Sequence, residues 1–340
     1  MHHVLVAVDG SDLAHTAAHY AHDLARAAGR DLVALAVLSP DLISALGETP
    51  ETLAYSAWPP EGEQLGKRAI REWFDQTEDL CAEAGVCFTR TVDTGQPAER
   101  LIWAAMSAHL TVLGAHGSHS PLPHPQGAGL GKTAYQVVRH CLKPMLIVRG
   151  EYRPIKRVVF GWDDHPQAAH AAEMVAELGQ GQGWEVLVVS GTLPTSPMAQ
   201  SCSGIAQSLA AAGIAAESVI AEGNAPQVLF DAAARYQPDL LVLGGHRRTA
   251  RGLLSEGAWL QIVQQAQMPV LLYRWAGAVP WPVAPASRRC SAVGTVKPAS
   301  AAPPRPPLLD LRPGSLPQGT GPGGEGVQVG VVPLEVDHVL

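Results

Sequence analysis

Two glycine-rich stretches of the chain carry residue types suited to holding an anion. Gly114 and Gly117 follow an apolar run at 110–113, and Gly131 to Thr133 stands where a helical pattern begins. Glycine lets the backbone approach a bound group closely, and the start of a helix presents N–H groups with a partial positive charge. Asp9 adds a carboxylate at the end of another apolar run. These spacings favour a phosphate site at one edge of a sheet.

Short apolar segments that alternate with helical patterns must position these residues. The predicted strands lie near 2–8, 32–38, 86–93, 110–114, 144–149, 156–162, 184–190, 216–222, 239–244 and 269–274. The predicted helices lie near 12–28, 64–84, 96–107, 131–142, 166–179, 198–213, 224–236 and 256–267. Apolar runs of this kind suit strands covered on both faces. Strict alternation then predicts an α/β fold with doubly wound, Rossmann-like parallel sheets, whose ligands bind where the strand order reverses.

The β/α pattern occurs twice along the chain. Val4–Asp9 is echoed by Val158–Asp163, and 110–114 is echoed by 240–244. An internal repeat of this kind predicts two five-stranded domains that form an internal pseudo-dimer. The predicted boundaries are 1–150 for the first domain and 151–275 for the second. Residues 276–340 form a tail whose proline and glycine content predicts disorder. The first domain also carries an insertion near 39–65, which we expect in a surface loop.

The composition narrows the classes of function. A net charge of −7 argues against a general nucleic-acid binder, and no apolar run is long enough for a membrane helix. The five cysteines are odd in number and contain no Cys-x-x-Cys pair, which predicts reduced side chains in a cytoplasmic protein. The chain contains neither a Gly-x-Ser-x-Gly nucleophile motif nor a His-Glu-x-x-His zinc motif. We therefore predict no catalytic residues and no metal ligands.

Several segments, in this order, resemble the universal stress protein domain. They are Val4–Ser11, Gly95–Ala98, Val112–Gly117, Val137–His140 and Pro144–Val148. Both units match, so the resemblance covers roughly residues 1–275 and the arrangement is similar to a tandem universal stress protein. Family dimers commonly pair through the last strand. The resemblance therefore implies that Met145–Val148 and Val270–Tyr273 pair with each other within one chain, which would cover two sheet edges.

The family's phosphate-loop pattern, Gly-x2-Gly-x9-Gly-Ser/Thr, is only partly kept in the first unit. Gly114 and Gly117 satisfy its first half, but the nine-residue spacing leads to Gly127-Ala128, which lacks a hydroxyl. Counting back from Pro144 selects Gly131-Lys132-Thr133 instead, after a longer spacer. We prefer this second alignment because it keeps the helix length, and it offers Lys132 as a phosphate ligand in place of the hydroxyl.

The second unit departs further from that pattern. Gly244 is kept, but Arg247 stands in place of the second glycine, and Gly257-Ala258 again lacks the hydroxyl. We therefore predict a degenerate site in this unit.

The resemblance implies that the first unit of a stress-response protein binds an adenine nucleotide, ATP or AMP, with Mg²⁺ accompanying ATP. The predicted nucleotide-binding residues are Asp9, Val37, Gly114, His116, Gly117, Gly131, Lys132 and Thr133. One alternative is an interaction protein with both pockets degenerate, which recruits an unknown protein partner through the pseudo-dimer surface or the tail. A weaker alternative is a nucleotide-hydrolysing or adenylate-transferring enzyme. A further homodimer through other faces stays open in each case.

Some of these residues also have purely structural interpretations. Asp9 and Asp163 are residue types that cap helices, and Lys132 would serve equally as a solvated surface charge. The histidines at 15, 19 and 22 have spacings that zinc sites use, but they lie about 200° from the apolar stripe of their helix, so we expect them to face solvent. A P-loop would require a glycine at Gln126, which argues against that motif.

Overall fold

The computed structural model describes residues 3–39, 65–117, 129–245 and 256–274, all of which belong to one unit of the chain, residues 1–299. The predicted tail lies outside these ranges, and so does the predicted insertion near 39–65 except for its first and last residues. Gln126, Gly127-Ala128 and Arg247, on which other predictions rest, also lie outside the described residues. Within the described part, the elements follow the predicted order.

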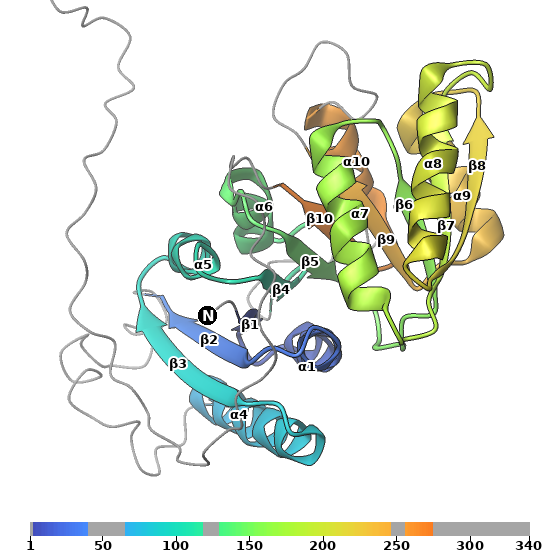
Figure 1. The fold of residues 1–340 in the computed structure, drawn as a ribbon. Helices are drawn as coiled ribbons and strands as arrows, with labels where there is room; N and C mark the ends of the chain where they lie inside the picture. Colours follow the sequence, from blue (N-terminus) through green and yellow to red (C-terminus); the bar gives the residue numbers. More distant parts are fainter. Residues whose placement is uncertain (1–2, 40–64, 118–128, 246–255, 275–340) are drawn as a thin grey trace, which may run out of the picture. The chain divides into compact units, whose positions relative to one another are not determined.

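The two repeats consist of alternating strands and helices, labelled as in Figure 1. The first contains β1 (Val4–Val8), α1 (Asp12–Ala27), β2 (Leu32–Leu38), α4 (Leu65–Ala84), β3 (Phe88–Thr94), α5 (Pro97–Ala105), β4 (Leu110–Gly114), α6 (Lys132–His140) and β5 (Met145–Val148). The second contains β6 (Arg157–Gly161), α7 (Pro166–Gly179), β7 (Glu185–Gly191), α8 (Pro197–Ala211), β8 (Ala215–Ala221), α9 (Ala225–Tyr236), β9 (Leu240–Gly244), α10 (Glu256–Gln265) and β10 (Val270–Tyr273). The sequence predictions differ from these bounds by one or two residues at element ends, where assignments commonly vary.

All the strands belong to one ten-stranded sheet with the order β3-β2-β1-β4-β5-β10-β9-β6-β7-β8 (Figure 1). Neighbouring strands are parallel within each repeat, and the repeats meet where β5 and β10 pair antiparallel. Leu271 lies opposite Leu146 in that pairing, and both side chains are buried. The predicted pairing of the two last strands is therefore confirmed, and the repeats form an internal pseudo-dimer.

The sheet is covered by helices on both faces, as its apolar strands predict. Alternate residues of β1 show the two layers, because Val4 and Val6 pack in one core cluster and Leu5 packs in the other. One cluster includes residues of α1, α4, α7 and α8, and the other includes residues of α5, α6, α9 and α10. Burial on both faces explains why the strands are continuous apolar runs. Among the described residues, no helix is both long and apolar enough to span a membrane.

The expectation that three histidines of α1 face solvent is wrong for His22. Its side chain is buried, with 7% of the residue exposed, and its Nδ1 lies 3.1 Å from Asp23 Oδ1. His19 is exposed but packs its ring against Tyr152, with a centroid distance of 5.1 Å. The apolar stripe of α1 faces the sheet, while α4, α7 and Tyr152 cover further parts of the same helix. The periodicity of one helix could not reveal those neighbours.

The prediction that the cysteines are reduced holds for three of those that the structure describes. Cys81, Cys141 and Cys202 are free and buried. Burial in apolar surroundings raises the pKa of the Cys202 thiol to about 11, so this group stays protonated and unreactive at neutral pH.

Candidate functional site

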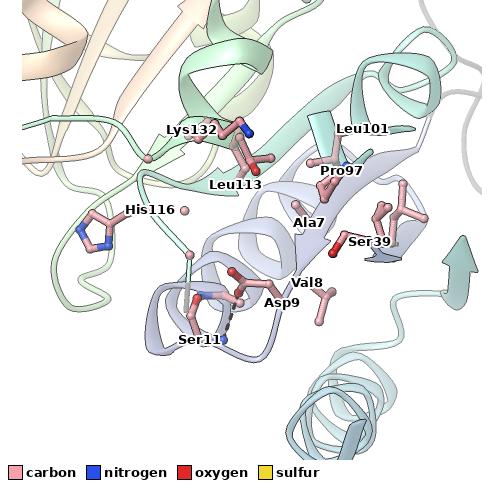
Figure 2. A pocket seen from close by; sticks show the side chains of 18 of the residues that line it. Ala7, Val8, Asp9, Ser11, Ser39, Pro97, Leu101, Leu113, His116 and Lys132 are labelled. Carbon is pink, nitrogen blue, oxygen red and sulfur yellow. Dashed lines mark hydrogen bonds between the residues drawn. The ribbon is translucent and has the colours of Figure 1, made fainter. Parts of the chain in front are cut away.

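A pocket of about 480 Å³ opens at the carboxyl ends of β1, β2 and β4 (Figure 2). Going along the sheet from β1, the chain order runs one way through β2 and β3 and the other way through β4 and β5. The pocket therefore lies where the strand order reverses, which is where open α/β sheets bind ligands. The starts of α1 and α6, part of α5 and one residue of α4 complete its walls.

All the residues predicted to form the site line this pocket. They are Asp9, Val37, Gly114, His116, Gly117, Gly131, Lys132 and Thr133. The sequence interpretation missed the apolar wall, to which Ala7, Leu35, Leu101 and Leu113 contribute, and it also missed Ser11, Ser39 and Pro97. Part of this wall was detectable in principle, because Ala7 lies opposite Leu35 in the β1–β2 register and residues two apart in a strand share a face.

Asp9 follows β1 and is exposed at the pocket. Its Oδ1 accepts a hydrogen bond from the Ser11 N–H at 3.0 Å, while the Ser11 hydroxyl accepts from the Ala14 N–H at 3.2 Å (Figure 2). Ser11 is therefore the N-cap residue of α1, so the alternative interpretation of Asp9 as the helix cap is wrong. Asp9 Oδ2 faces Gly117, where an added Cβ would lie only 2.2 Å away. Glycine at 117 is thus what allows the carboxylate to lie here.

The start of α6 presents backbone donors to the same pocket. Its N-cap is Gly131, which has no side chain to accept a hydrogen bond from the first turn. The Gly131 N–H donates to Ala115 O at 2.8 Å, and the first helical bond runs from the Tyr135 N–H to Gly131 O. The N–H groups of the intervening residues have no acceptor within the helix. Together with the exposed ammonium of Lys132, they give this wall a positive potential suited to an anion.

The profile of the universal stress protein family matches residues 1–149 and 198–274, which is more than half of the chain. The chain belongs to the universal stress protein family. A curated universal stress protein from Mycolicibacterium smegmatis is 30% identical over 151 residues, which cover 43% of this chain and 45% of that relative. The match thus spans less than half the length of that universal stress protein.

Two solved structures show the same fold over most of the chain. A universal stress protein from Archaeoglobus fulgidus has a TM-score of 0.54 at 13% identity, and the match covers 79% of this chain and 97% of that one. A putative universal stress protein from Pseudomonas aeruginosa has a TM-score of 0.54 at 15% identity, with coverages of 80% and 92%. Both matches extend across the two repeats, so the tandem arrangement is itself shared with known structures of the family.

The two universal stress protein repeats differ at the end of their central strands. Ala7 and Val37 of the first repeat correspond in register to Gly161 and Gly191 of the second. A Cβ at Gly161 would lie 3.0 Å from Leu243 and 3.1 Å from Leu229, so these two leucines fill the space beside the strand. At Gly191, the added Cβ would lie 3.2 Å from the carbonyl oxygen of the loop before α9. Among the described residues, side chains and backbone therefore fill the second cleft at the ends of β6 and β7.

The polar residue at the mouth of the second cleft is also withdrawn from solvent. Asp163, the counterpart of Asp9, is only 5% exposed, and its Oδ1 accepts from the His165 N–H at 3.2 Å. His165 is the N-cap residue of α7, so the prediction that Asp163 caps this helix is also wrong. The preceding Trp162 is buried, and its Nε1–H donates to the Ser201 hydroxyl at 3.1 Å. Asp163 and Trp162 are thus packed among their neighbours at the carboxyl end of β6, whereas Asp9 is exposed.

Proposed function

We propose that the first repeat binds an adenine nucleotide, ATP or AMP, and that the second repeat binds none. The observation that carries this proposal is the convergence of all eight predicted residues on one cavity beside an uncapped helix start. Its volume of about 480 Å³ is in the range of pockets that hold small molecules. The proposal treats residues 1–150 and 151–275 as unequal domains of one stress-response protein.

The pocket has an apolar part that suits a base and a polar part that suits phosphates. The base packs against the wall formed by Ala7, Val37 and Leu101, at the ends of β1 and β2 and in α5. The phosphates lie against the first turn of α6, where backbone N–H groups and the Lys132 ammonium face them. With ATP, Mg²⁺ would neutralise part of the phosphate charge.

Asp9 has a different role in this arrangement, because a carboxylate repels phosphate. One of its oxygens accepts the Ser11 N–H, and the other lies beside Gly117 at the wall of the pocket. That second oxygen accepts a hydrogen bond from a ribose hydroxyl, which fixes the sugar between the base and the phosphates. A nucleotide whose ribose lacks this hydroxyl should therefore bind more weakly than its ribose counterpart.

Calorimetry of the full chain with ATP and Mg²⁺, and separately with AMP, tests the proposal. Replacing Lys132 by Met should weaken ATP binding about tenfold, the usual effect of losing one charge-assisted hydrogen bond. Lys156→Met is the matched control, because Lys156 is exposed at the start of the second repeat. Absence of binding of both nucleotides to the wild-type protein at millimolar concentration would overturn the proposal, as would equal losses in the two variants.

A bulky residue at 117 provides a second, steric test. Gly117→Val places a side chain where Asp9 Oδ2 now lies, so the carboxylate must move and the mouth of the pocket must narrow. We expect ATP binding to be lost while the circular dichroism spectrum stays that of the wild type. Unchanged affinity in a folded Gly117→Val protein would show that the nucleotide does not use this pocket.

A further inference from the structure

The carboxyl-terminal end of α10, in the second repeat, obtains hydrogen-bond donors from the first repeat. The last carbonyl groups of a helix have no partner within it. The guanidinium of Arg149, the residue that follows β5, donates through Nη2 to the carbonyl oxygens of Val263 at 2.8 Å and Gln264 at 3.4 Å. Arg149 is 6% exposed, and burial lowers the pKa of its guanidinium. The two hydrogen bonds offset part of the free-energy cost of burying the charged guanidinium.

Gly129 links the same end of α10 to the nucleotide pocket. Its N–H donates to Gln264 O at 2.9 Å, so this carbonyl accepts from both Gly129 and Arg149. Two residues later, the N–H of Gly131 donates to Ala115 O at 2.8 Å and α6 begins. The turn that leads into α6 is thus held on one side by the second repeat and on the other by the first.

The conformation of this turn depends on glycine and on its anchors. Gly129 has a φ of 132°, a conformation that residues with a side chain rarely adopt. A glycine has more conformational freedom to lose than other residues, so such a turn keeps one geometry only where contacts define it. The hydrogen bond to Gln264 O is a contact of this kind, and it comes from outside the repeat that contains the pocket.

Arg274 makes the reciprocal contact and provides a natural control. It follows β10 as Arg149 follows β5, is 2% exposed, and donates through Nη1 to Val138 O near the end of α6. Its guanidinium also packs over the ring of Trp259, 4.7 Å from the centroid. Each buried arginine therefore binds the last helix of the opposite repeat, but the contact of Arg274 lies at the end of α6 remote from the pocket.

We infer that the second repeat positions the phosphate-binding turn of the first, with Arg149 as the positioning residue. The inference rests on the proposed nucleotide site. Arg149 fixes the last turn of α10, Gln264 O fixes Gly129, and Gly129 sets the direction in which α6 begins. The N–H groups of that first turn bind phosphate well only if their direction is already set, since ordering them on binding would cost affinity. The closed repeat thus contributes to ligand binding without holding a ligand.

The test compares the wild-type protein with Arg149→Met, Arg149→Lys and Arg274→Met, measuring ATP affinity by calorimetry and unfolding temperature for each. Arg149→Met should weaken ATP binding about tenfold, the size expected when donors to a charged group lose their fixed position. Arg149→Lys should recover part of this loss, because an ammonium still donates to Val263 O. Arg274→Met should keep ATP affinity within about twofold of wild type although it removes a similar buried contact and lowers the unfolding temperature.

Hydrogen exchange of the nucleotide-free proteins gives a second readout. The Gly129 amide should exchange faster in Arg149→Met than in Arg274→Met, and Arg149→Lys should lie between wild type and Arg149→Met. If Arg149→Met does not fold, Arg149→Lys carries both measurements. Equal ATP affinities in wild type and Arg149→Met, or equal losses in the two methionine variants, would overturn the inference. Failure of the wild type to bind ATP would instead refute the proposed function, and amide exchange would then decide whether Arg149 fixes the turn.

Discussion

The two repeats have the same strand order within one sheet, yet the described residues leave a cleft open in the first and fill it in the second. The difference arises from very small changes at the carboxyl ends of the central strands. Where the first repeat has Ala7 and Val37, the second has glycines, and α9 and its preceding loop lie against the strands. In the second repeat, which lacks these side chains, neighbouring groups occupy the space beside the strands. In the first repeat, Ala7 and Val37 instead line the pocket together with Leu101 of α5.

Equivalent leucines in the two repeats test this comparison most strongly. Leu101 and Leu229 are 4% and 3% exposed, but Leu101 lines the open pocket whereas Leu229 packs against Gly161. We expect Leu229→Ala to lower the free energy of unfolding by about 3 kcal/mol and Leu101→Ala by about 2 kcal/mol or less, since the cost grows with the cavity created. Urea denaturation measures both. A larger loss for Leu101→Ala would mean that the first cleft is not open in solution.

The next largest difference in unfolding free energy is expected for substitutions of the glycines that end β4 and β9, Gly114 and Gly244. A Cβ at Gly244 would lie 2.5 Å from the backbone nitrogen of Ala168, whereas a Cβ at Gly114 would meet the Leu13 Cβ at 2.9 Å. Backbone atoms inside α7 cannot move independently of the helix. Gly244→Ala should therefore cost about 2 kcal/mol of unfolding free energy and Gly114→Ala about 1 kcal/mol, within the range for overpacked sites. Urea denaturation measures both losses. A larger loss for Gly114→Ala than for Gly244→Ala would contradict the close approach of α7 to Gly244.

Much of the fold could be predicted from the sequence. The spacing of apolar residues in each strand and helix shows which of its faces is buried. The start of α6 at Lys132 was also predictable by counting back from Pro144, since helix length is set by the distance the chain must cross. The closure of the second cleft was not. It follows from the strand register that pairs Gly161 with Leu243 and from the packing of Leu229 of α9 against Gly161, and a sequence alone does not show such neighbours.

The smallest predicted difference concerns stability at acid pH. It involves two carboxylates at corresponding positions, Asp23 in α1 and Glu177 in α7. Glu177 Oε1 accepts from Arg30 at 2.9 Å, and Oε2 lies 3.2 Å from His109 Nε2, so this carboxylate joins the repeats. Burial acts to raise the pKa of Glu177, but His109 and Arg30 outweigh it and hold the pKa below its usual value. Similarly, burial acts to raise the pKa of Asp23, but hydrogen bonds from His22 and Tyr152 keep it low.

A lowered carboxylate pKa contributes stability that is fully present above the unfolded-state value, near 4. That contribution is lost as the pH falls through the lower folded-state value. The unfolding temperature of the wild type should therefore drop below about pH 4, and both Glu177→Gln and Asp23→Asn should show a shallower drop. Thermal scans between neutral and acid pH measure this slope. If the unfolding temperature of Glu177→Gln falls with pH as steeply as that of the wild type, the ionised Glu177 carboxylate does not stabilise the contact between the repeats.

The antiparallel pairing of β5 with β10 has a consequence for how such an assembly responds to dilution. Two separate subunits joined by a strand pair dissociate when their concentration falls below the dissociation constant, but two halves of one polypeptide keep a fixed effective concentration. The contact between the two repeats should therefore not dissociate when the protein concentration is low. It can therefore tolerate substitutions that would cause a homodimer to dissociate, and each half is free to change independently of the symmetry that identical subunits impose.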